Sequence, residues 1–368
     1  MALAEEAGAS GGGGGDDGGT GGGSSGGGGG VDAGCQQFLC PQLDWTSSQS
    51  GEGFYYWSLA PGLNLQSLDR FNVYASFQNA SFVRHYEFRF VNGTPSTVFR
   101  SNFPGGRDAR TLRGISLTDQ WFNFNGEAQH VVGSATAVAY SGCSLSDGGL
   151  TSPTHHNALP ISADEAYLIG YPMSFCRWTS DGGLVQTAEV RPNFYMLDAY
   201  RAPSGKFYVA GGDYSTSNGV CVITNELGAL YGAPNVVDDT YGDGCNSIDG
   251  KGEDVFVVAR DDLAGHGKIL RLQEDGGFDV VFTANFRLNR LDVLPSGEVW
   301  AVGAAGSNAI YFDGGSWAEI PLPLTETRFN VDWENVAGTD EGLVLTGSEW
   351  LPDGGYAAVV NSYRFFGK

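Results

Sequence analysis

The chain has 368 residues, with 42 acidic and 20 basic side chains that give a formal net charge of −22. This charge repels phosphate backbones and anionic lipid headgroups, so it excludes charge-driven binding to nucleic acids or to membrane surfaces. Hydrophobic residues make up 41% of the chain, enough for a large buried core, and no run of 18 apolar residues predicts a transmembrane segment.

The first 34 residues differ in composition from the rest. Seventeen of the 27 residues from Gly8 to Gly34 are glycine. Such a stretch has too little apolar surface to offset the entropy lost on ordering, so residues 1–34 are predicted to be a flexible tether. The opening Met1-Ala2-Leu3-Ala4 fits the end of a secretory signal, or else an ordinary start. A tether behind a processing site is typical of a secreted or lipoprotein-like surface protein.

Six cysteines are present, and none has the spacing of a zinc site. An even number of cysteines favours disulfides and an oxidising compartment, the alternative being six buried thiols. Six cysteines allow about 15 pairings, and the connectivity stays open. The most natural pairing joins neighbours in sequence: Cys35 with Cys40, Cys143 with Cys176, and Cys221 with Cys245. Residues 35–53 then form a disulfide-tied lead-in to a folded domain at 54–368. This even set of six cysteines predicts an exported protein, extracellular or on the outer cell surface.

A repeat of 37 to 48 residues follows along the folded domain. Leu197-Asp198-Ala199 and Leu291-Asp292-Val293 each precede a Pro-Ser-Gly turn, and the turns begin at Pro203 and Pro295. After each turn comes a short apolar strand, and related strands end at residues 133, 170, 211, 259, 303 and 347. Asp-Gly-Gly, a strong hairpin signal, recurs at Asp147, Asp181, Asp275, Asp313 and Asp353.

Four short antiparallel strands per repeat predict an all-β fold, a β-propeller. Six repeats are evident from about residue 107, and residues 54–106 are expected to make a seventh blade, with six blades as the alternative. The last repeat has three clear strands, so an N-terminal strand near Phe54-Tyr55-Tyr56-Trp57 is expected to complete it and close the ring.

The repeat that contains Ile310-Tyr311-Phe312-Asp313-Gly314-Gly315-Ser316-Trp317 resembles the Asp-box (BNR) type of secreted propeller. Thr179-Ser180-Asp181-Gly182-Gly183 matches the first half of that box, and the other copies lack its leading Ser or Thr. The resemblance spans residues 54–368 and implies the fold, because Asp-boxes stabilise hairpin turns. The tether in front of it is similar in style to those of bacterial surface proteins from myxobacteria-like genomes.

Two clusters are candidates for metal binding. Acidic residues gather between Asp238 and Asp254, where oxygen ligands and glycine turns suit calcium, although their spacing does not match an EF-hand loop and an exposed acidic loop is the commoner meaning. His155 and His156 lack an evident third ligand. The sequence therefore assigns no metal ligand and no cofactor, with calcium left open.

Candidate catalytic and sugar-binding residues are also few. Propeller glycosidases of the sialidase type need an arginine cluster with a Tyr/Glu pair, and their Phe-Arg-Ile-Pro segment is absent, Arg191-Pro192 being the nearest fragment. His130 and His266 have no evident nucleophile nearby. Trp300 and Trp317 lie at repeat positions typical of packing, so the candidates for an exposed sugar-stacking surface are Trp45, Trp57, Trp121 and Trp350.

Non-enzymatic binding of a glycan or a protein at one mouth of the propeller is therefore the predicted function, with no catalytic residue assigned. The alternatives are a propeller-type glycosidase or lyase, and a structural part of a surface assembly. A convergent set of Arg, Tyr and Glu side chains at the mouth would favour the enzyme.

Overall fold

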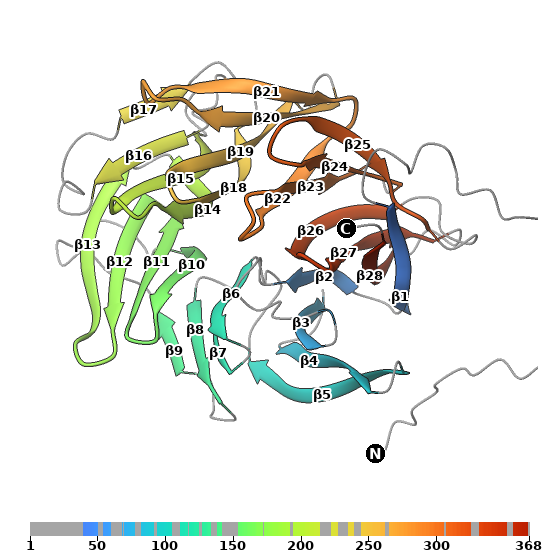
Figure 1. The fold of residues 1–368 in the computed structure, drawn as a ribbon. Helices are drawn as coiled ribbons and strands as arrows, with labels where there is room; N and C mark the ends of the chain where they lie inside the picture. The colour runs from blue at the N-terminus through green and yellow to red at the C-terminus, as the bar shows by residue number, and fades with distance from the viewer. Residues whose placement is uncertain are drawn as a thin grey trace, which may run out of the picture. The chain divides into compact units, whose positions relative to one another are not determined.

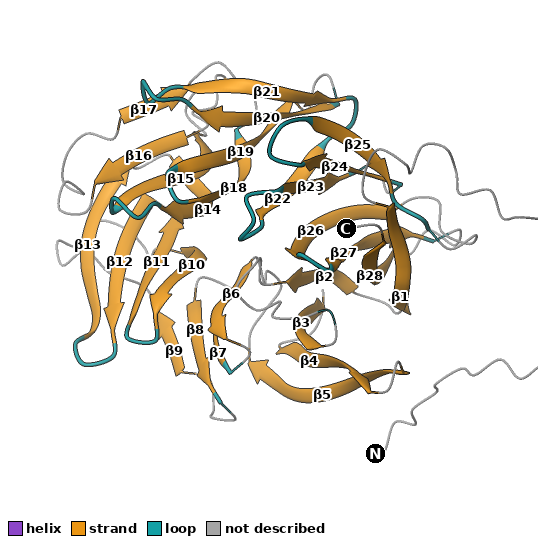
Figure 2. Cartoon of the chain, viewed as in Figure 1, coloured by secondary structure: helices purple, strands orange, loops and turns teal. Residues whose placement is uncertain are grey.

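The structure is a computed structural model of the chain, in which Leu39–Lys368 form one compact unit. The residues described are 40–50, 54–59, 68, 70–77, 82–91, 94–104, 111–116, 118–124, 127–133, 138–141, 154–171, 173–191, 194–213, 222–226, 235–238, 244–261, 265–304, 307–324, 331–351 and 356–366. Their regular secondary structure is β-strand, as Figures 1 and 2 show.

These residues form seven four-stranded antiparallel sheets. The first four sheets comprise β2 (Phe54–Leu59), β3 (Arg70–Phe77), β4 (Phe82–Val91) and β5 (Thr94–Pro104); β6 (Thr111–Ser116), β7 (Asp119–Phe124), β8 (Glu127–Val132) and β9 (Val138–Ser141); β10 (Thr154–Ser162), β11 (Glu165–Tyr171), β12 (Met173–Thr179) and β13 (Gly183–Arg191); β14 (Phe194–Arg201), β15 (Lys206–Asp213), β16 (Val222–Glu226) and β17 (Asn235–Asp238). The others comprise β18 (Cys245–Lys251), β19 (Asp254–Asp261), β20 (His266–Leu272) and β21 (Phe278–Ala284); β22 (Leu288–Val293), β23 (Val299–Gly303), β24 (Asn308–Phe312) and β25 (Trp317–Pro321); β26 (Val331–Thr339), β27 (Gly342–Trp350), β28 (Tyr356–Phe366) and β1 (Cys40–Ser50).

The predicted repeat unit corresponds to one sheet. Six of the sheets consist of four strands that are consecutive in the chain, joined in order by hairpins. The first strands of neighbouring sheets contact one another, from β2 through β6, β10, β14, β18 and β22 to β26, and β26 also contacts β2. Each first strand is therefore an edge strand of its own sheet that faces the first strand of the next.

Where its side chains are described, the second strand of a sheet is buried on both faces, as in β15, β19, β23 and β27. Side chains alternate along a strand, so Val299 and Ala301 of β23 pack toward the preceding sheet, while Trp300 and Val302 pack toward the following one. Residues 299–303 accordingly form an uninterrupted apolar run with every residue buried. The core thus lies between neighbouring sheets, and burial of a side chain the size of Trp300 contributes about 3 kcal/mol.

Three of the Asp-Gly-Gly turns, at Asp181, Asp275 and Asp313, join the third and fourth strands of their sheets, as the hairpin signal predicted. Between β24 and β25, the Asp313 carboxylate accepts hydrogen bonds from the backbone N–H groups of Gly315 and Ser316, both at 2.7 Å. Gly314 has a φ of 96°, which other L-residues rarely adopt, so this position favours glycine. Asp275 accepts from the Gly277 N–H in the same way, whereas Asp147 and Asp353 lie outside the described residues.

The N-terminal strand of the last sheet is not the one expected. The strand that pairs with β28 is β1, in which Cys40 lies opposite Phe366. The segment Phe54–Trp57 instead belongs to β2, which pairs with β3. Much of the predicted lead-in at 35–53 is therefore a strand of a sheet.

Candidate functional site

Polar side chains occupy one row of the first strands, immediately after a local irregularity. In all seven first strands the pairing with the second strand shifts by one residue, which bends the strand and redirects the next side chain. In β10, β14, β18, β22 and β26 a polar residue of the same row follows such a shift: Asn157, Asp198, Ser247, Arg290 and Asn335.

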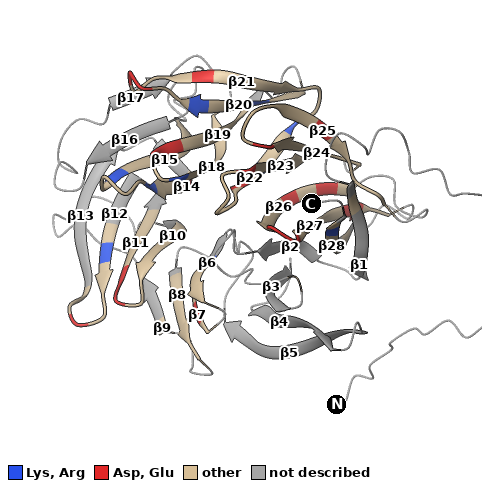
Figure 3. Ribbon diagram, in the orientation of Figure 1, with Lys and Arg blue, Asp and Glu red and all other residues tan. Residues whose placement is uncertain are grey.

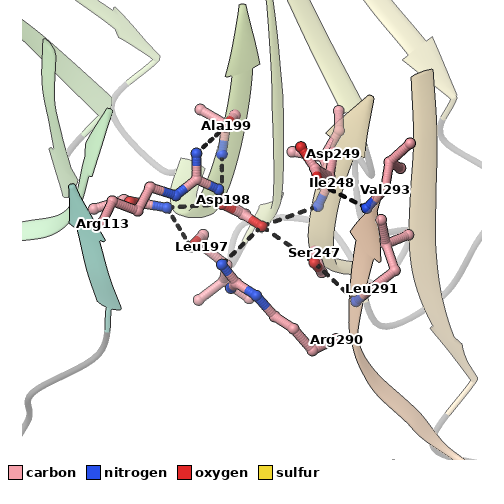
Figure 4. Close-up of polar contacts among 11 residues, drawn as sticks. Arg113, Leu197, Asp198, Ala199, Ser247, Ile248, Asp249, Arg290, Leu291 and Val293 are labelled. Carbon is pink, nitrogen blue, oxygen red and sulfur yellow. Dashed lines mark hydrogen bonds and ion pairs between the residues drawn. The ribbon is translucent and has the colours of Figure 1, made fainter. Parts of the chain in front are cut away.

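Asp198, one residue of this row, lies between the side chains of Arg113 and Arg290 (Figure 4). The Arg113 guanidinium from β6 donates to Asp198 Oδ1, and Arg290 Nη2 from β22 lies 3.3 Å from Oδ2. Asn157 Nδ2 also donates to Oδ1, at 2.9 Å. The carboxylate is 1% exposed, so its two arginines and its hydrogen bonds offset the cost of removing it from water.

Side chains of this row, together with Asp249 and Asp292 two residues further along their strands, join β14 to β18, β18 to β22 and β22 to β26. Asp198 Oδ2 accepts from the Ile248 N–H of β18 at 3.1 Å, and Asp249 Oδ2 accepts from the Val293 N–H of β22 at 2.9 Å. Because first strands are edge strands, these N–H groups have no partner in their own sheet, and the neighbouring carboxylates satisfy them. Two further bonds repeat the pattern: Leu291 N–H to Ser247 Oγ at 3.3 Å, and Gly338 N–H to Asp292 Oδ2 at 2.7 Å.

The pairing of β14 with β15 and of β22 with β23 shows that the two Leu-Asp motifs of the sequence do not occupy equivalent positions in their sheets. Asp198 lies opposite Ala210 in β15, whereas Asp292 lies opposite Trp300 in β23. Counted back from the matching turns at Pro203 and Pro295, Arg290 is the counterpart of Asp198, and Asp292 is two residues further along. A shift of two residues keeps a side chain on the same face, so both aspartates point toward neighbouring first strands.

Asp249 and Asp292 differ from Asp198 in having few cationic partners. Burial raises the pKa of Asp292 well above its usual value, and the nearby Asp249 carboxyl raises it further. Burial also raises the pKa of Asp249, against the lowering effect of the Val293 N–H bond. Both groups therefore hold a proton more tightly than an exposed aspartate does.

A pocket of about 510 Å³ opens where these first strands end. It is lined by residues from β6, from the ends of β10, β14, β18 and β22, and from the turns that follow them: Arg113, Leu159, Pro160, Ile161, Tyr200, Arg201, Ala202, Pro203, Asp249, Gly250, Lys251, Val293, Leu294 and Pro295. The volume falls within the range of small-ligand sites, about 300–1,000 Å³.

One tyrosine and one carboxyl group lie among the basic residues of the pocket. The Tyr200 hydroxyl donates to the Gly252 carbonyl at 2.8 Å. Burial and the carboxylate of Asp249 raise the pKa of Tyr200 to about 12, so this phenol stays neutral at physiological pH. Asp249 is the one acidic residue among those that line the pocket. Sequence reasoning missed this site, because its residues come from five strands and are brought together by register.

The tryptophans and histidines singled out in the sequence lie elsewhere. Trp121 is fully buried and stacks on His130, which contacts Asp119 at 2.7 Å, so both are core residues. Trp350, one of the candidates for exposure, is 54% exposed. His266 is an exposed residue of β20. The side chains of Trp45, Trp57, His155, His156 and Arg191 lie outside the described part of the structure.

The acidic cluster is only partly described. Glu253 accepts hydrogen bonds from Ser204, and Asp254 pairs with Arg271 at 2.8 Å, so these carboxylates already have protein partners. Among the described residues, no group of three potential ligands is placed to hold a metal ion. Of the cysteines, Cys176 and Cys245 are fully buried and neither is a free thiol; Cys35, Cys143 and Cys221 and the side chain of Cys40 are not described.

Comparison with known proteins identifies the fold. No family model matches the chain, and no curated protein sequence matches it. Among solved structures, Ycf48 bound to a D1 peptide is 15% identical with a TM-score of 0.54, and the match covers 88% of this chain and 97% of that one. The WD40 propeller domain of Doa1 is 13% identical with a TM-score of 0.56, covering 88% and 96%. The chain folds as a β-propeller.

A third similar propeller is an enzyme. Virginiamycin B lyase from Staphylococcus aureus, in a catalytically inactive form with quinupristin, is 11% identical with a TM-score of 0.53, covering 86% of this chain and 98% of that one. At these identities the likeness extends to the propeller fold and not to function. The described part of the propeller contains no helix long and apolar enough to span a membrane.

Proposed function

We propose that this protein is an exported, closed seven-bladed propeller that binds a ligand, without catalysis, in the pocket at the ends of β10, β14, β18 and β22. The ring of contacts between first strands, which returns from β26 to β2, supports seven blades and closure through β1 and β28. The Asp313 turn supports a relation to Asp-box propellers.

The pocket is the observation that carries the binding function. Its walls are built from edge strands whose positions are fixed by the buried Asp198 network, so the cavity is held in shape before a ligand arrives. Apolar side chains with a few polar groups are typical of binding sites. Ycf48, one of the similar propellers, binds a D1 peptide, which makes a peptide a natural candidate ligand here as well.

A glycosidase or lyase is the second candidate, because Arg113, Tyr200 and Asp249 converge on the pocket. The geometry favours it less. Most glycosidases use two carboxyl groups on either side of the bond that is cleaved, and here Asp249 lines the pocket while Asp292 is fully buried. A tyrosine nucleophile needs activation, whereas the pKa of Tyr200 is raised to about 12.

Filling the pocket tests the proposal. Ile161, a half-buried residue of β10 that lines the pocket, is replaced in Ile161→Trp. The wild type and the variant are screened on a peptide array and on a glycan array, with and without calcium. We expect ligands that bind the wild type to lose at least about tenfold in affinity for the variant, equivalent to 1.4 kcal/mol.

A matched control is Val280→Trp, which places the same side chain on an exposed position of β21 outside the pocket and should bind as the wild type does. Unchanged melting temperatures would show that both variants fold. Ligands that bind Ile161→Trp as well as the wild type would contradict the proposed site, and turnover of fluorogenic glycosides by the wild type would favour the enzyme instead.

A further inference from the structure

The pocket holds two basic residues whose charges are not balanced. Arg201 ends β14, and Lys251 ends β18. In the described part of the chain neither has a carboxylate partner: the Arg201 guanidinium lies 5.9 Å above the Phe207 ring, and its buried Nε has no acceptor. Basic residues thus gather near the adjoining ends of β14 and β15 in a strongly acidic protein (Figure 3).

The acidic residues near these two cations are already engaged. Glu253 accepts from the Ser204 backbone N–H at 2.8 Å and from its hydroxyl at 3.1 Å. Asp254 is paired with Arg271 through two hydrogen bonds of 2.8 Å. Asp249 accepts the Val293 N–H at 2.9 Å, and burial raises its pKa.

A buried arginine adds to this positive charge. Arg113 is 8% exposed, lines the pocket, and has a buried Nε without an acceptor among the described residues. Its two terminal nitrogens contact Asp198 Oδ1 and the Ala199 carbonyl. Arg290 shares Asp198 with it, so one carboxylate serves two guanidinium groups. An anion is therefore favoured in the pocket, where low exposure strengthens the attraction.

The remaining lining is apolar. Tyr200 donates its hydroxyl proton to the Gly252 carbonyl, so it has no proton left to donate to a ligand. Eight lining residues have apolar side chains: Leu159, Pro160, Ile161, Ala202, Pro203, Val293, Leu294 and Pro295. Such walls suit a hydrocarbon body and provide few partners for the hydroxyl groups of a glycan or for the several oxygens of a phosphate.

From this combination we propose that the pocket binds an apolar molecule through its carboxylate, which pairs with Arg201 and Lys251. The planar guanidinium matches the two oxygens of a carboxylate, and Lys251 supplies a second charge. Two sources share this chemistry: the C-terminus of a peptide that ends in apolar residues, and a small aliphatic acid. The proposal rests on the proposed function, because it names the ligand class of the same pocket.

Matched probes separate charge from shape. We would measure calorimetric binding of a tetrapeptide ending in Ile-Leu, as the free acid and as the C-terminal amide, and of octanoate and octanamide. We expect each acid to bind at least about tenfold more tightly than its amide. The better-bound acid identifies the source: the peptide favours a protein C-terminus, and octanoate favours a small acid. Equal affinity of both acids and their amides would overturn the proposal.

Variants of Arg201 and Lys251 then test whether these two residues pair with the carboxylate of the ligand. Arg201→Gln and Lys251→Gln should each weaken binding of the acids about tenfold and leave the amides unaffected, and Arg201→Lys should restore part of the loss. Lys206→Gln is the control, because it removes one charge from the same hairpin but lies outside the pocket. Lys251 is exposed, so its replacement tests the proposal even if Arg201→Gln proves unstable.

Failure of this inference is distinguishable from failure of the proposed function. Some array ligands could lose affinity in Ile161→Trp but bind Arg201→Gln and Lys251→Gln as well as they bind the wild type. That result would overturn the proposed carboxylate recognition and would still support the proposed binding pocket. Ligands insensitive to all three variants would overturn both.

Discussion

Two buried aspartates, Asp198 on β14 and Asp292 on β22, illustrate how environment sets the chemistry of a residue. Asp198 receives two guanidinium groups, an amide and two backbone N–H groups. Asp292, also fully buried, accepts the Gly338 N–H through one oxygen, and its other oxygen has no hydrogen-bond partner among the described residues. The Asp198 carboxylate joins its own strand β14 to β6, β10, β18 and β22 and so links five sheets, whereas ionising the Asp292 carboxyl is costly.

Asp292→Asn is expected to stabilise the protein at neutral pH, because the amide still accepts the Gly338 bond without a charge. The pKa of Asp292 is raised in the folded state, mainly by burial and by Asp249, against the attraction of Arg290. Its protonation therefore favours folding below the usual carboxyl pKa of about 4, and this contribution is lost as pH rises through the folded pKa. Each unit of the shift corresponds to about 1.4 kcal/mol.

The measurement is the melting temperature of wild type and variant from about pH 4, the usual carboxyl pKa, up to about pH 9. The advantage of Asp292→Asn should grow as pH rises and vanish near pH 4. Asp313→Asn is the control with the opposite sign, because hydrogen bonds from Ser316 and Gly315 lower the pKa of Asp313. A variant at 292 that is less stable than the wild type at every pH would refute this account.

At the scale of elements, β1 is the strand that joins the two ends of the folded unit. It pairs along β28, from Cys40 opposite Phe366 to Ser50 opposite Ala357, with one irregularity after Leu43. Without it, β28 would present a row of unpaired backbone groups, which is a template for association with other chains.

Two truncations test the part that β1 plays. Removing residues 1–34 leaves β1 in place, and the melting temperature should stay within about 2 °C of the wild type, a change smaller than 1 kcal/mol produces in a large domain. Removing residues 1–53 also deletes β1, and we expect a melting temperature several degrees lower together with concentration-dependent self-association in light scattering. Equal stability and monomeric behaviour of the two truncations would contradict a structural role for β1.

The sequence predicted those elements whose signals are local. Apolar runs such as residues 299–303 and turns such as Asp313-Gly314-Gly315 depend on neighbours in the chain, so the repeat of strands and hairpins could be predicted. Strand β1 was missed because it is the outer strand of its sheet and polar along most of its length, while the aromatic Phe54–Trp57 had the stronger strand pattern. The pocket depends on register across sheets, which no local pattern encodes.

At the scale of the whole molecule, the cysteines bear on both compartment and stability. Cys176 lies in the third strand of one sheet and Cys245 in the first strand of another, and both are fully buried. We propose that they pair with Cys143 and Cys221, and Cys35 with Cys40, as expected for an exported protein. In the chain-entropy account, the Cys143–Cys176 and Cys221–Cys245 disulfides, which close the longer loops, would each stabilise the fold by about 3–4 kcal/mol.

Intact-mass analysis after alkylation tests whether the six cysteines form disulfides. Protein exported to an oxidising compartment should take up no alkylating reagent before reduction and should be modified at all six cysteines after reduction and unfolding. Reduction should also lower the melting temperature by more than about 5 °C, since each longer link is worth several kcal/mol. Peptide mapping without reduction then identifies the pairs. Alkylation of unreduced, unfolded protein at Cys176 or Cys245 would rule out these disulfides, and with them the strongest argument for export.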